Sequence, residues 1–389
     1  MTSGHSLGEV AFHLLCHGAA LDAQDAWIEG AVQRWGPGER LLELELNPHW
    51  HLQVAVATGR AEAVKMRVRE ESVAIDYAGE TFPARIECRP EFLDQTAPSG
   101  VPRSALARTF YNYLMFHPLS LHAEGAERRV MITPPGAEPI PLEFDDVLDV
   151  TGAALRAERI DGVSLRWALR VTPGEVDVAL GPLLRAIRRN FDVVIAAECP
   201  PPRDAGALDL LYGEGADAIS LPILGMTADA PRGATLAEAL HALQRAVVVF
   251  PRGTVLAPLL LGCESPAATR ETVSRLASMG ACAALDTRLL GEHWEKHRRV
   301  WTSAEIAHLW QHLEEEIARA RLARPWTPHP MTESLAIPAW SFDPAAPCEP
   351  LRGGFWQSRP GQMVVKNLIR LRRRLRVRRV DQSLESSEL

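Results

Sequence analysis

The sequence predicts an α/β fold in which a full or partial β/α barrel follows a small antiparallel β region. Two observations carry this prediction. After about residue 129, apolar runs alternate with segments of helical periodicity, whereas residues 41 to 88 alternate apolar with polar side chains. Continuous apolar runs are typical of parallel strands buried on both faces, and alternation is typical of antiparallel strands with one wet face.

The N-terminal part, residues 1–100, is predicted to hold one helix and the antiparallel sheet. Ser6 precedes a stretch of helical spacing that continues to His17, and Glu9 completes a capping-box pattern with that serine. Asn-Pro, Thr-Gly and Ala-Gly-Glu sequences, which favour turns, separate the strands that follow. The expected strands read LLELEL, HLQVAVA, VKMRVRE, SVAIDYAG and ARIEC.

Residues 101–325 are predicted to form the barrel. Six apolar strands are expected to alternate with helices, and the lack of a GxGxxG turn favours a barrel over a dinucleotide-binding sheet. The expected strands are RVMITPP, GVSLRWAL, DVVIAAE, ADAISLPIL, VLAPLLLGCES and ACAALDTRLL. Residues 326–389 are expected to form a C-terminal extension with a basic amphipathic helix.

Composition restricts the class of protein. The chain has 389 residues, 47% of them hydrophobic, and a formal net charge of -7, as an ordinary globular protein has. No window approaches the ~18 apolar residues of a membrane span, and the N-terminus lacks the pattern of a signal peptide, so we expect a cytoplasmic protein. Scattered cysteines predict no metal site from spacing; they stand at positions 16, 88, 199, 263, 282 and 348.

Polar residues at the ends of several expected strands mark a candidate pocket. In a β/α barrel the carboxyl ends of the strands face the active-site mouth. Glu198 follows VVIAA, Glu264 follows LLLGC, and Asp286 and Arg288 follow ACAAL. Each side chain alone could equally cap the next helix or face solvent, but together they predict a pocket.

At these residues the chain resembles the radical S-adenosylmethionine (SAM) enzymes, in the branch with a biotin-synthase-like, TIM-like barrel. LLLGCESPAATRETVSRLASMGACAAL resembles the family's fifth strand and following helix, where a G-x-I-x-G-x-x-E type motif lies beside the adenine of SAM. Gly262 and Glu264 match that motif, and Glu198 in IAAECPP matches a fourth-strand position near the SAM amino acid or ribose. The resemblance therefore implies that Glu198, Gly262 and Glu264 contact SAM or a related nucleoside.

Three departures from the family concern its cofactors. Family members bind a [4Fe–4S] cluster through C-x3-C-x2-C after the first barrel strand, but the corresponding RTFYNYLMFHPLSLHAEGAERR contains no cysteine. Thiolates are the ordinary ligands of such clusters, and His117 and His122 in this stretch are expected to be structural or surface residues. Arg166 and Trp167 stand where the family's G-G-E-P motif holds the SAM amino group, and the C-terminal cysteines of many relatives are missing. We expect a degenerate member, a pseudoenzyme without the [4Fe–4S] cluster or another metal.

Two functions remain open on the sequence, and so does the question of whether the chain is an enzyme. One is a non-radical accessory or partner subunit in a cofactor or natural-product biosynthetic pathway, working beside an active radical SAM relative. The other is an enzyme whose repurposed pocket binds SAM or another small molecule and uses Glu198 and Glu264 in non-radical chemistry. A Ser-His-Asp or Cys-His site also remains open, because such triads leave no spacing signal.

Two further stretches bear on ligands and partners. The aromatic residues of RTFYNYLMFHP are expected either to pack in the core or against a partner, or to line a small-molecule pocket. In residues 364–380, Val364, Leu368, Leu371 and Leu375 recur at helical spacing, and eight basic but no acidic residues lie between positions 366 and 379. Such a helix could dock on an acidic protein, lie on an anionic membrane or pack on its own barrel. Nucleic-acid binding is not expected, because no base-reading module accompanies the basic residues.

Overall fold

The fold is seen in a computed structural model, which describes most of the chain up to residue 322 and part of a C-terminal helix. The described residues are 5–21, 33–36, 39–47, 50–56, 63–69, 72–87, 89–110, 113–124, 127–134, 137–157, 160–168, 176–202, 204–223, 236–261, 264–286, 302–322, 360, 363–364, 367–368 and 370–371. None of the helices in these ranges combines the length and apolar character needed to cross a bilayer.

The N-terminal part contains the expected helix and sheet. Helix α1 (Leu7–His17) begins at Ser6, whose hydroxyl accepts from the Glu9 backbone while the Glu9 side chain accepts from the Ser6 backbone, so the capping box is confirmed. The sheet has the order β1-β5-β6-β7-β3-β2, with β4 on β3, and is antiparallel except where β1 pairs with β5. Its strands are β1 (Ala19–Leu21), β2 (Gln33–Gly36), β3 (Glu39–Asn47), β4 (Trp50–Ala55), β5 (Val64–Arg69), β6 (Ser72–Tyr77) and β7 (Glu80–Ile86).

A second large sheet forms a curled half-barrel. Its order is β17-β16-β15-β14-β13-β9-β8, in which all neighbours are parallel except β8 and β9. The strands are β8 (Ala107–Phe110), β9 (Tyr113–Phe116), β13 (Gly162–Arg166), β14 (Val194–Glu198), β15 (Ala218–Ser220), β16 (Val255–Leu260) and β17 (Cys282–Asp286). Within the described part of the chain, β17 and β8 are the two edges, so a closed barrel is not formed there.

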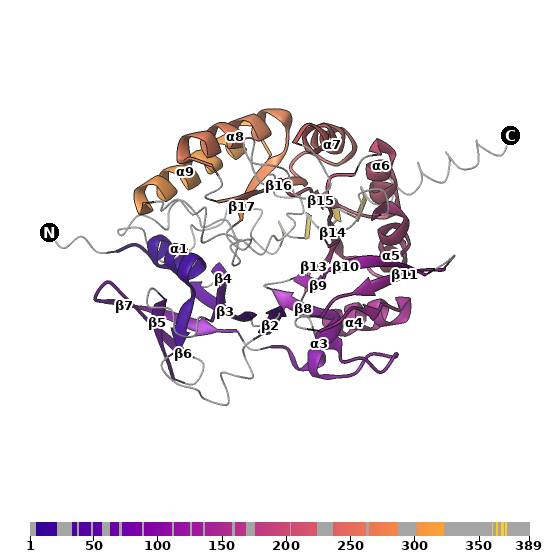
Figure 1. Cartoon of the computed structure of the whole chain (residues 1–389), viewed down its shortest axis with the longest axis horizontal. Helices are drawn as coiled ribbons and strands as arrows, with labels where there is room; N and C mark the ends of the chain where they lie inside the picture. The colour runs from indigo at the N-terminus through magenta and orange to yellow at the C-terminus, as the bar shows by residue number, and fades with distance from the viewer. Residues whose placement is uncertain are drawn as a thin grey trace.

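Helices connect the parallel strands and cover one face of this sheet. They are α4 (Phe144–Arg156), α5 (Val176–Asn190), α6 (Ala205–Glu214), α7 (Leu236–Val249), α8 (Pro266–Met279) and α9 (Ser303–Arg319). Figure 1 shows them as an arc outside the strands, with the N-terminal sheet and α1 across the open side of the arc. One hydrophobic core cluster includes residues of both sheets, such as Leu44 and Leu165. We call the face of the half-barrel that is turned away from its helices the inner face.

The prediction that RVMITPP forms the first parallel strand of the barrel is wrong. Strand β11 (Glu127–Ile132) pairs antiparallel with β10 (Leu119–Glu124) and with β12 (Ile140–Pro141) in a separate three-stranded sheet. Only two residues connect β10 to β11, and a parallel pairing needs a much longer crossover. The first parallel strand is β9, in the aromatic-rich stretch, and the other five expected strands are confirmed.

A 3-10 turn, η1 (Glu91–Asp94), and a short helix, α3 (Arg103–Leu106), connect the N-terminal sheet to β8. Arg103 is buried, and its guanidinium donates to both carboxylate oxygens of Asp149 on α4, at 2.8 and 3.0 Å. A bidentate pair of this kind fixes direction as well as distance. It holds the start of β8 against the first helix of the half-barrel.

Candidate functional site

A row of polar side chains lies at the carboxyl end of the half-barrel. Strand register places Arg166 on β13 opposite Glu198 on β14, and Glu198 opposite Ser220 on β15. Residues paired across neighbouring strands share a face of the sheet. Arg166 Nε lies 3.0 Å from Glu198 Oε1, and the two side chains are only 12% and 13% exposed. The sequence-predicted Glu198 is therefore held in a largely buried ion pair.

This row lies on the inner face. Arg166 lies near enough to lower the pKa of Arg108, which also responds to Glu43 of the N-terminal sheet on the open side of the half-barrel, whereas Val163 and Leu165 stand at alternate positions of β13. Because side chains of a strand alternate between its faces, Ser164 and Arg166 point the other way.

A second cation, Arg108, joins this row from the edge strand β8. Arg108 is 4% exposed, and register through Met115 to Ser164 places it on the same inner face. Burial lowers the pKa of its guanidinium well below the usual value, the nearby Arg166 lowers it further, and Glu43 opposes both effects. Glu43 belongs to β3 and is itself 5% exposed, so the N-terminal sheet supplies a carboxylate to the half-barrel.

His117, directly after β9, completes what we call the inner network: Arg108, Arg166, Glu198, Glu43 and His117. Its Nε2 lies 3.1 Å from the Ser104 carbonyl oxygen. The pKa of His117 is lowered from 6.5 to about 4: burial is the main cause, the hydrogen bond to the Ser104 backbone opposes it, and the nearby Arg108 and Arg166 add to the lowering. The imidazole is therefore neutral at neutral pH, with Nε2 donating to Ser104.

The charges of the inner network balance. Arg108 and Arg166 carry two positive charges, Glu43 and Glu198 carry two negative charges, and His117 is neutral. Buried charges that are paired within the protein avoid much of the penalty of an isolated buried ion. Arg166 therefore already holds one oxygen of the Glu198 carboxylate.

Glu264 is directed elsewhere. It lies two residues before α8, is 6% exposed, and accepts a hydrogen bond of 3.1 Å from Thr272 Oγ1 within that helix. Its carboxylate therefore turns toward α8, whereas Glu198 turns toward β13. Gly262 and Arg288 lie outside the described residues, and Asp286 is described only as the last residue of β17. The role of Glu198, Gly262 and Glu264 in contacting SAM stays a prediction.

The aromatic stretch fills the amino end of the inner face. Phe110, Tyr113 and Met115 form one buried cluster with Val194. A Cβ added at Gly162 would lie 2.4 Å from Tyr113 Cε1, so the ring packs directly on the glycine backbone. For these residues, core packing is observed.

Trp167 follows Arg166 and is fully buried. Its backbone N–H donates to the Glu198 carbonyl oxygen at 2.7 Å. By strand alternation its side chain lies on the face of β13 opposite to that of Arg166.

The residues after β9 do not fit a [4Fe–4S] cluster. The chain has no cysteine between positions 89 and 198, and the cysteines at the strand ends lie apart: Cys199 follows β14, and Cys282 begins β17 at the opposite end of its strand. Burial raises the pKa of the Cys282 thiol to about 12, which disfavours the thiolate that iron requires. In the described ranges, no three His, Cys, Asp or Glu side chains gather as metal ligands would.

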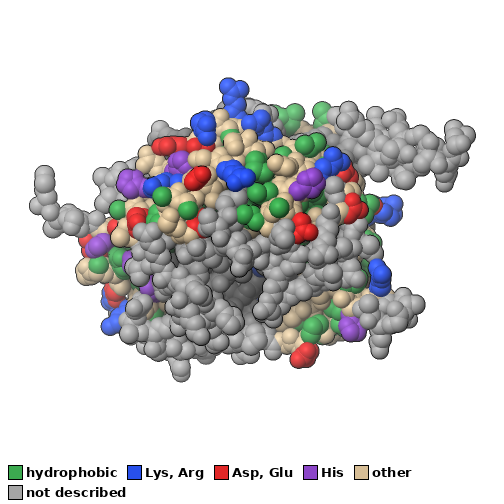
Figure 2. All heavy atoms as spheres, turned by 45° about the horizontal axis from the view of Figure 1, so that its top comes forward, with side chains coloured by type: hydrophobic (Ala, Val, Ile, Leu, Met, Phe, Trp, Pro, Cys, Tyr) green, Lys and Arg blue, Asp and Glu red, His purple; other side chains and the backbone are tan. Residues whose placement is uncertain are grey.

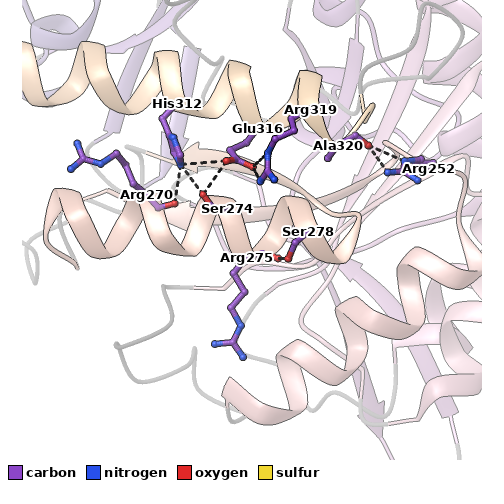
Figure 3. Close-up of polar contacts among 9 residues, drawn as sticks. All are labelled: Arg252, Arg270, Ser274, Arg275, Ser278, His312, Glu316, Arg319 and Ala320. Carbon is purple, nitrogen blue, oxygen red and sulfur yellow. Dashed lines mark hydrogen bonds and ion pairs between the residues drawn. The ribbon is translucent and has the colours of Figure 1, made fainter.

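A serine, a histidine and a glutamate meet outside the half-barrel, between α8 and α9 (Figure 3). Ser274 Oγ lies 2.8 Å from His312 Nε2 and donates to Glu316 Oε1 at 3.2 Å. The same Nε2 lies 3.2 Å from the Arg270 carbonyl oxygen and 4.0 Å from Glu316 Oε1. In a catalytic triad the acid instead holds Nδ1. This cluster is a polar contact between two helices.

Sequence reasoning missed Arg108 and Glu43. In LLELEL, Glu43 alternates with Leu42 and Leu44, which predicts a solvent-facing side chain, yet Glu43 is as buried as the leucines beside it. The reason is that the second face of β3 is also covered in the folded chain. The elements that pack on this second face determine the burial of Glu43, and the residue pattern of β3 alone does not show it.

No protein-family model and no curated protein matches the chain. Fifteen chains of solved structures match it. One is the crystal structure of methylornithine synthase (PylB), with a TM-score of 0.37 and 12% sequence identity. The match covers 46% of this chain and 55% of that chain, so this chain spans about half the length of the structure it matches.

Proposed function

We propose that the protein is a non-radical accessory or partner subunit, built on a radical-SAM-like half-barrel whose inner face is occupied by its own side chains. The observation that carries the proposal is the largely buried Arg166–Glu198 ion pair on the inner face. These residues stand where the sequence resemblance expects the group that holds the amino acid part of SAM.

Electrostatics supports this proposal. A ligand with charged groups would have to break the Arg166–Glu198 pair, and breaking a buried pair costs about 3–5 kcal/mol when the remaining charge finds no partner. The Phe110, Tyr113 and Met115 cluster also fills the amino end of the inner face. Such an interior maintains a fold without requiring a cofactor.

Anaerobic reconstitution with iron and sulfide tests the proposal. We expect the purified full chain to bind no more iron than its heat-unfolded form and to release no 5′-deoxyadenosine from SAM in the presence of dithionite. An active radical SAM enzyme treated in parallel serves as the positive control. A stoichiometric cluster together with reductive cleavage of SAM would overturn the proposal.

One observation favours the second candidate, an enzyme with a repurposed pocket for SAM or another small molecule. Ser220 Oγ and Trp167 Nε1 are buried, and neither atom has a hydrogen-bond partner in the described structure. Buried donors of this kind are usually satisfied, and a ligand is one way to satisfy them. In this candidate, Glu198 and Glu264 would serve non-radical chemistry.

Calorimetry with SAM and with S-adenosylhomocysteine separates the two candidates. The accessory role predicts no binding. The pocket predicts binding that weakens on Ser220→Ala and Glu264→Ala but not on Ser278→Ala, a matched control at a hydroxyl of α8 that contacts only its own helix. Binding with that pattern would favour the second candidate, the enzyme, over the accessory role.

A further inference from the structure

Exposed apolar side chains gather on the C-terminal helical segment, which we define as the described residues 360, 363–364, 367–368 and 370–371 (yellow in Figure 1). Four of the seven large hydrophobic side chains exposed in the described chain belong to it: Met363 (66%), Val364 (40%), Leu368 (42%) and Leu371 (55%). By contrast, the described surface over α7 to α9 mixes basic, acidic and hydrophobic side chains (Figure 2).

An ion pair shows which side of this helical segment faces the half-barrel. Arg370 contacts Asp192, in the connection between α5 and β14. At about 100° per helical residue, Arg370 lies about 100° or more around the helix from Val364, Leu368 and Leu371. The stripe formed by these three residues therefore lies away from the Asp192 contact, and all three side chains are exposed.

The spacing of this stripe is that of a coiled-coil seam. Val364, Leu368 and Leu371 are separated by four and three residues, and Leu375 continues the series in the sequence. A stripe this narrow is typical of a seam between two helices and not of a wide face packed on a globular core. Arg372 and Arg374 stand at the flanking positions that select the charge of a partner helix.

We propose that the C-terminal helical segment docks an acidic amphipathic helix of a partner protein. Leucine-rich positions of that helix would cover Val364, Leu368 and Leu371, and its carboxylates would meet the arginines beside the seam. Charge complementarity argues for this occupant, because positions 366–379 carry eight basic and no acidic residues. An anionic membrane fits less well, since residues 360–380 contain no aromatic side chain to anchor at a lipid interface.

The inference deepens the proposed accessory role and rests on it for the existence of a partner. Its test uses the full chain and two synthetic peptides with leucine at both seam positions of each heptad. One peptide carries glutamate and the other lysine at the flanking positions. Fluorescence anisotropy measures binding at low and at physiological salt, and phosphatidylserine vesicles are used in a parallel sedimentation assay.

We expect the glutamate peptide to bind and the lysine peptide not to bind. Salt should weaken the binding of the glutamate peptide. Leu368→Asp and Leu371→Asp should each weaken it by at least about tenfold. Val248→Asp is the matched control, because Val248 is also exposed (73%) but lies on α7. All three side chains are exposed, so these variants should fold. The inference is overturned if the glutamate peptide does not bind, if the lysine peptide binds equally well, or if Val248→Asp weakens binding as much as the leucine variants.

Vesicle binding that replaces peptide binding and is lost in the leucine variants would also overturn it, in favour of a membrane. These results are independent of the cluster and SAM measurements. A chain that binds the glutamate peptide but also cleaves SAM would refute only the proposed function. A chain that does neither would refute only the docking inference.

Discussion

The Arg166–Glu198 pair makes the most direct prediction of the structure. At 3.0 Å and an effective dielectric constant of ~20, the two charges attract each other by about 5 kcal/mol, and desolvation of both groups offsets most of this gain. Replacing one partner leaves the other charge buried. We therefore expect Arg166→Met and Glu198→Met each to lower the free energy of unfolding by about 3 kcal/mol.

The double variant distinguishes a structural pair from a functional one. With both charges replaced by methionine, little or no buried charge is left uncompensated at this position, and we expect the stability to return to within about 1 kcal/mol of the parent chain. Urea unfolding followed by circular dichroism gives the four free energies of the cycle.

An exposed pair provides the control. Arg245 and Asp209 join α7 to α6 at 2.6 Å, with side chains 41% and 47% exposed, so Asp209→Ala should cost less than about 1 kcal/mol. The reasoning is refuted if Glu198→Met costs no more than Asp209→Ala, or if the double variant costs the sum of the two single variants.

Three further predictions concern residues around the inner network. Because the pKa of His117 is about 4 in the folded chain and 6.5 when unperturbed, the unfolded chain binds a proton first as pH falls, and stability should drop by about 3 kcal/mol between these values. His117→Gln should flatten that part of a stability-against-pH curve, and an unchanged slope would contradict the assignment. Gly162→Ala should lower the free energy of unfolding by about 1–3 kcal/mol, because the added Cβ would overpack Tyr113. Gly181→Ala is the control and should cost no stability, because its added Cβ would meet its nearest neighbour at 3.6 Å. Equal thermal midpoints for the two variants would count against this packing. Cys282 should resist iodoacetamide in the native protein at mildly alkaline pH, because burial raises its pKa to about 12, and peptide mapping that finds rapid labelling would refute this.

Local patterns in the sequence predicted much of the fold. The capping box at Ser6, the alternation of the N-terminal strands and five of the six parallel strands follow from interactions within a few residues. The prediction of the sixth parallel strand, RVMITPP, was wrong for a reason that is also local. RVMITPP is apolar enough for a buried parallel strand, but its distance from the preceding strand permits only a hairpin.

The candidate site was predicted less completely. Glu198 was recognised as the polar end of a strand, and Arg166 and Trp167 as the residues that stand in place of the family's G-G-E-P motif. Their contact depends on the register between β13 and β14, which no residue pattern specifies. Glu264 shared the same strand-end signal but turns toward Thr272 in the next helix.

The sequence by itself determined the parallel β/α alternation, the antiparallel N-terminal strands and the absence of the cysteine triplet, because each depends on residue type and short spacing. Only the tertiary structure decided that β9 is the first parallel strand, that Glu43 of one sheet comes near Arg108 of the other, and that Glu198 is paired with Arg166. These contacts join residues far apart in the chain. Their free energy comes from burial and charge pairing, which exist only once the elements have packed.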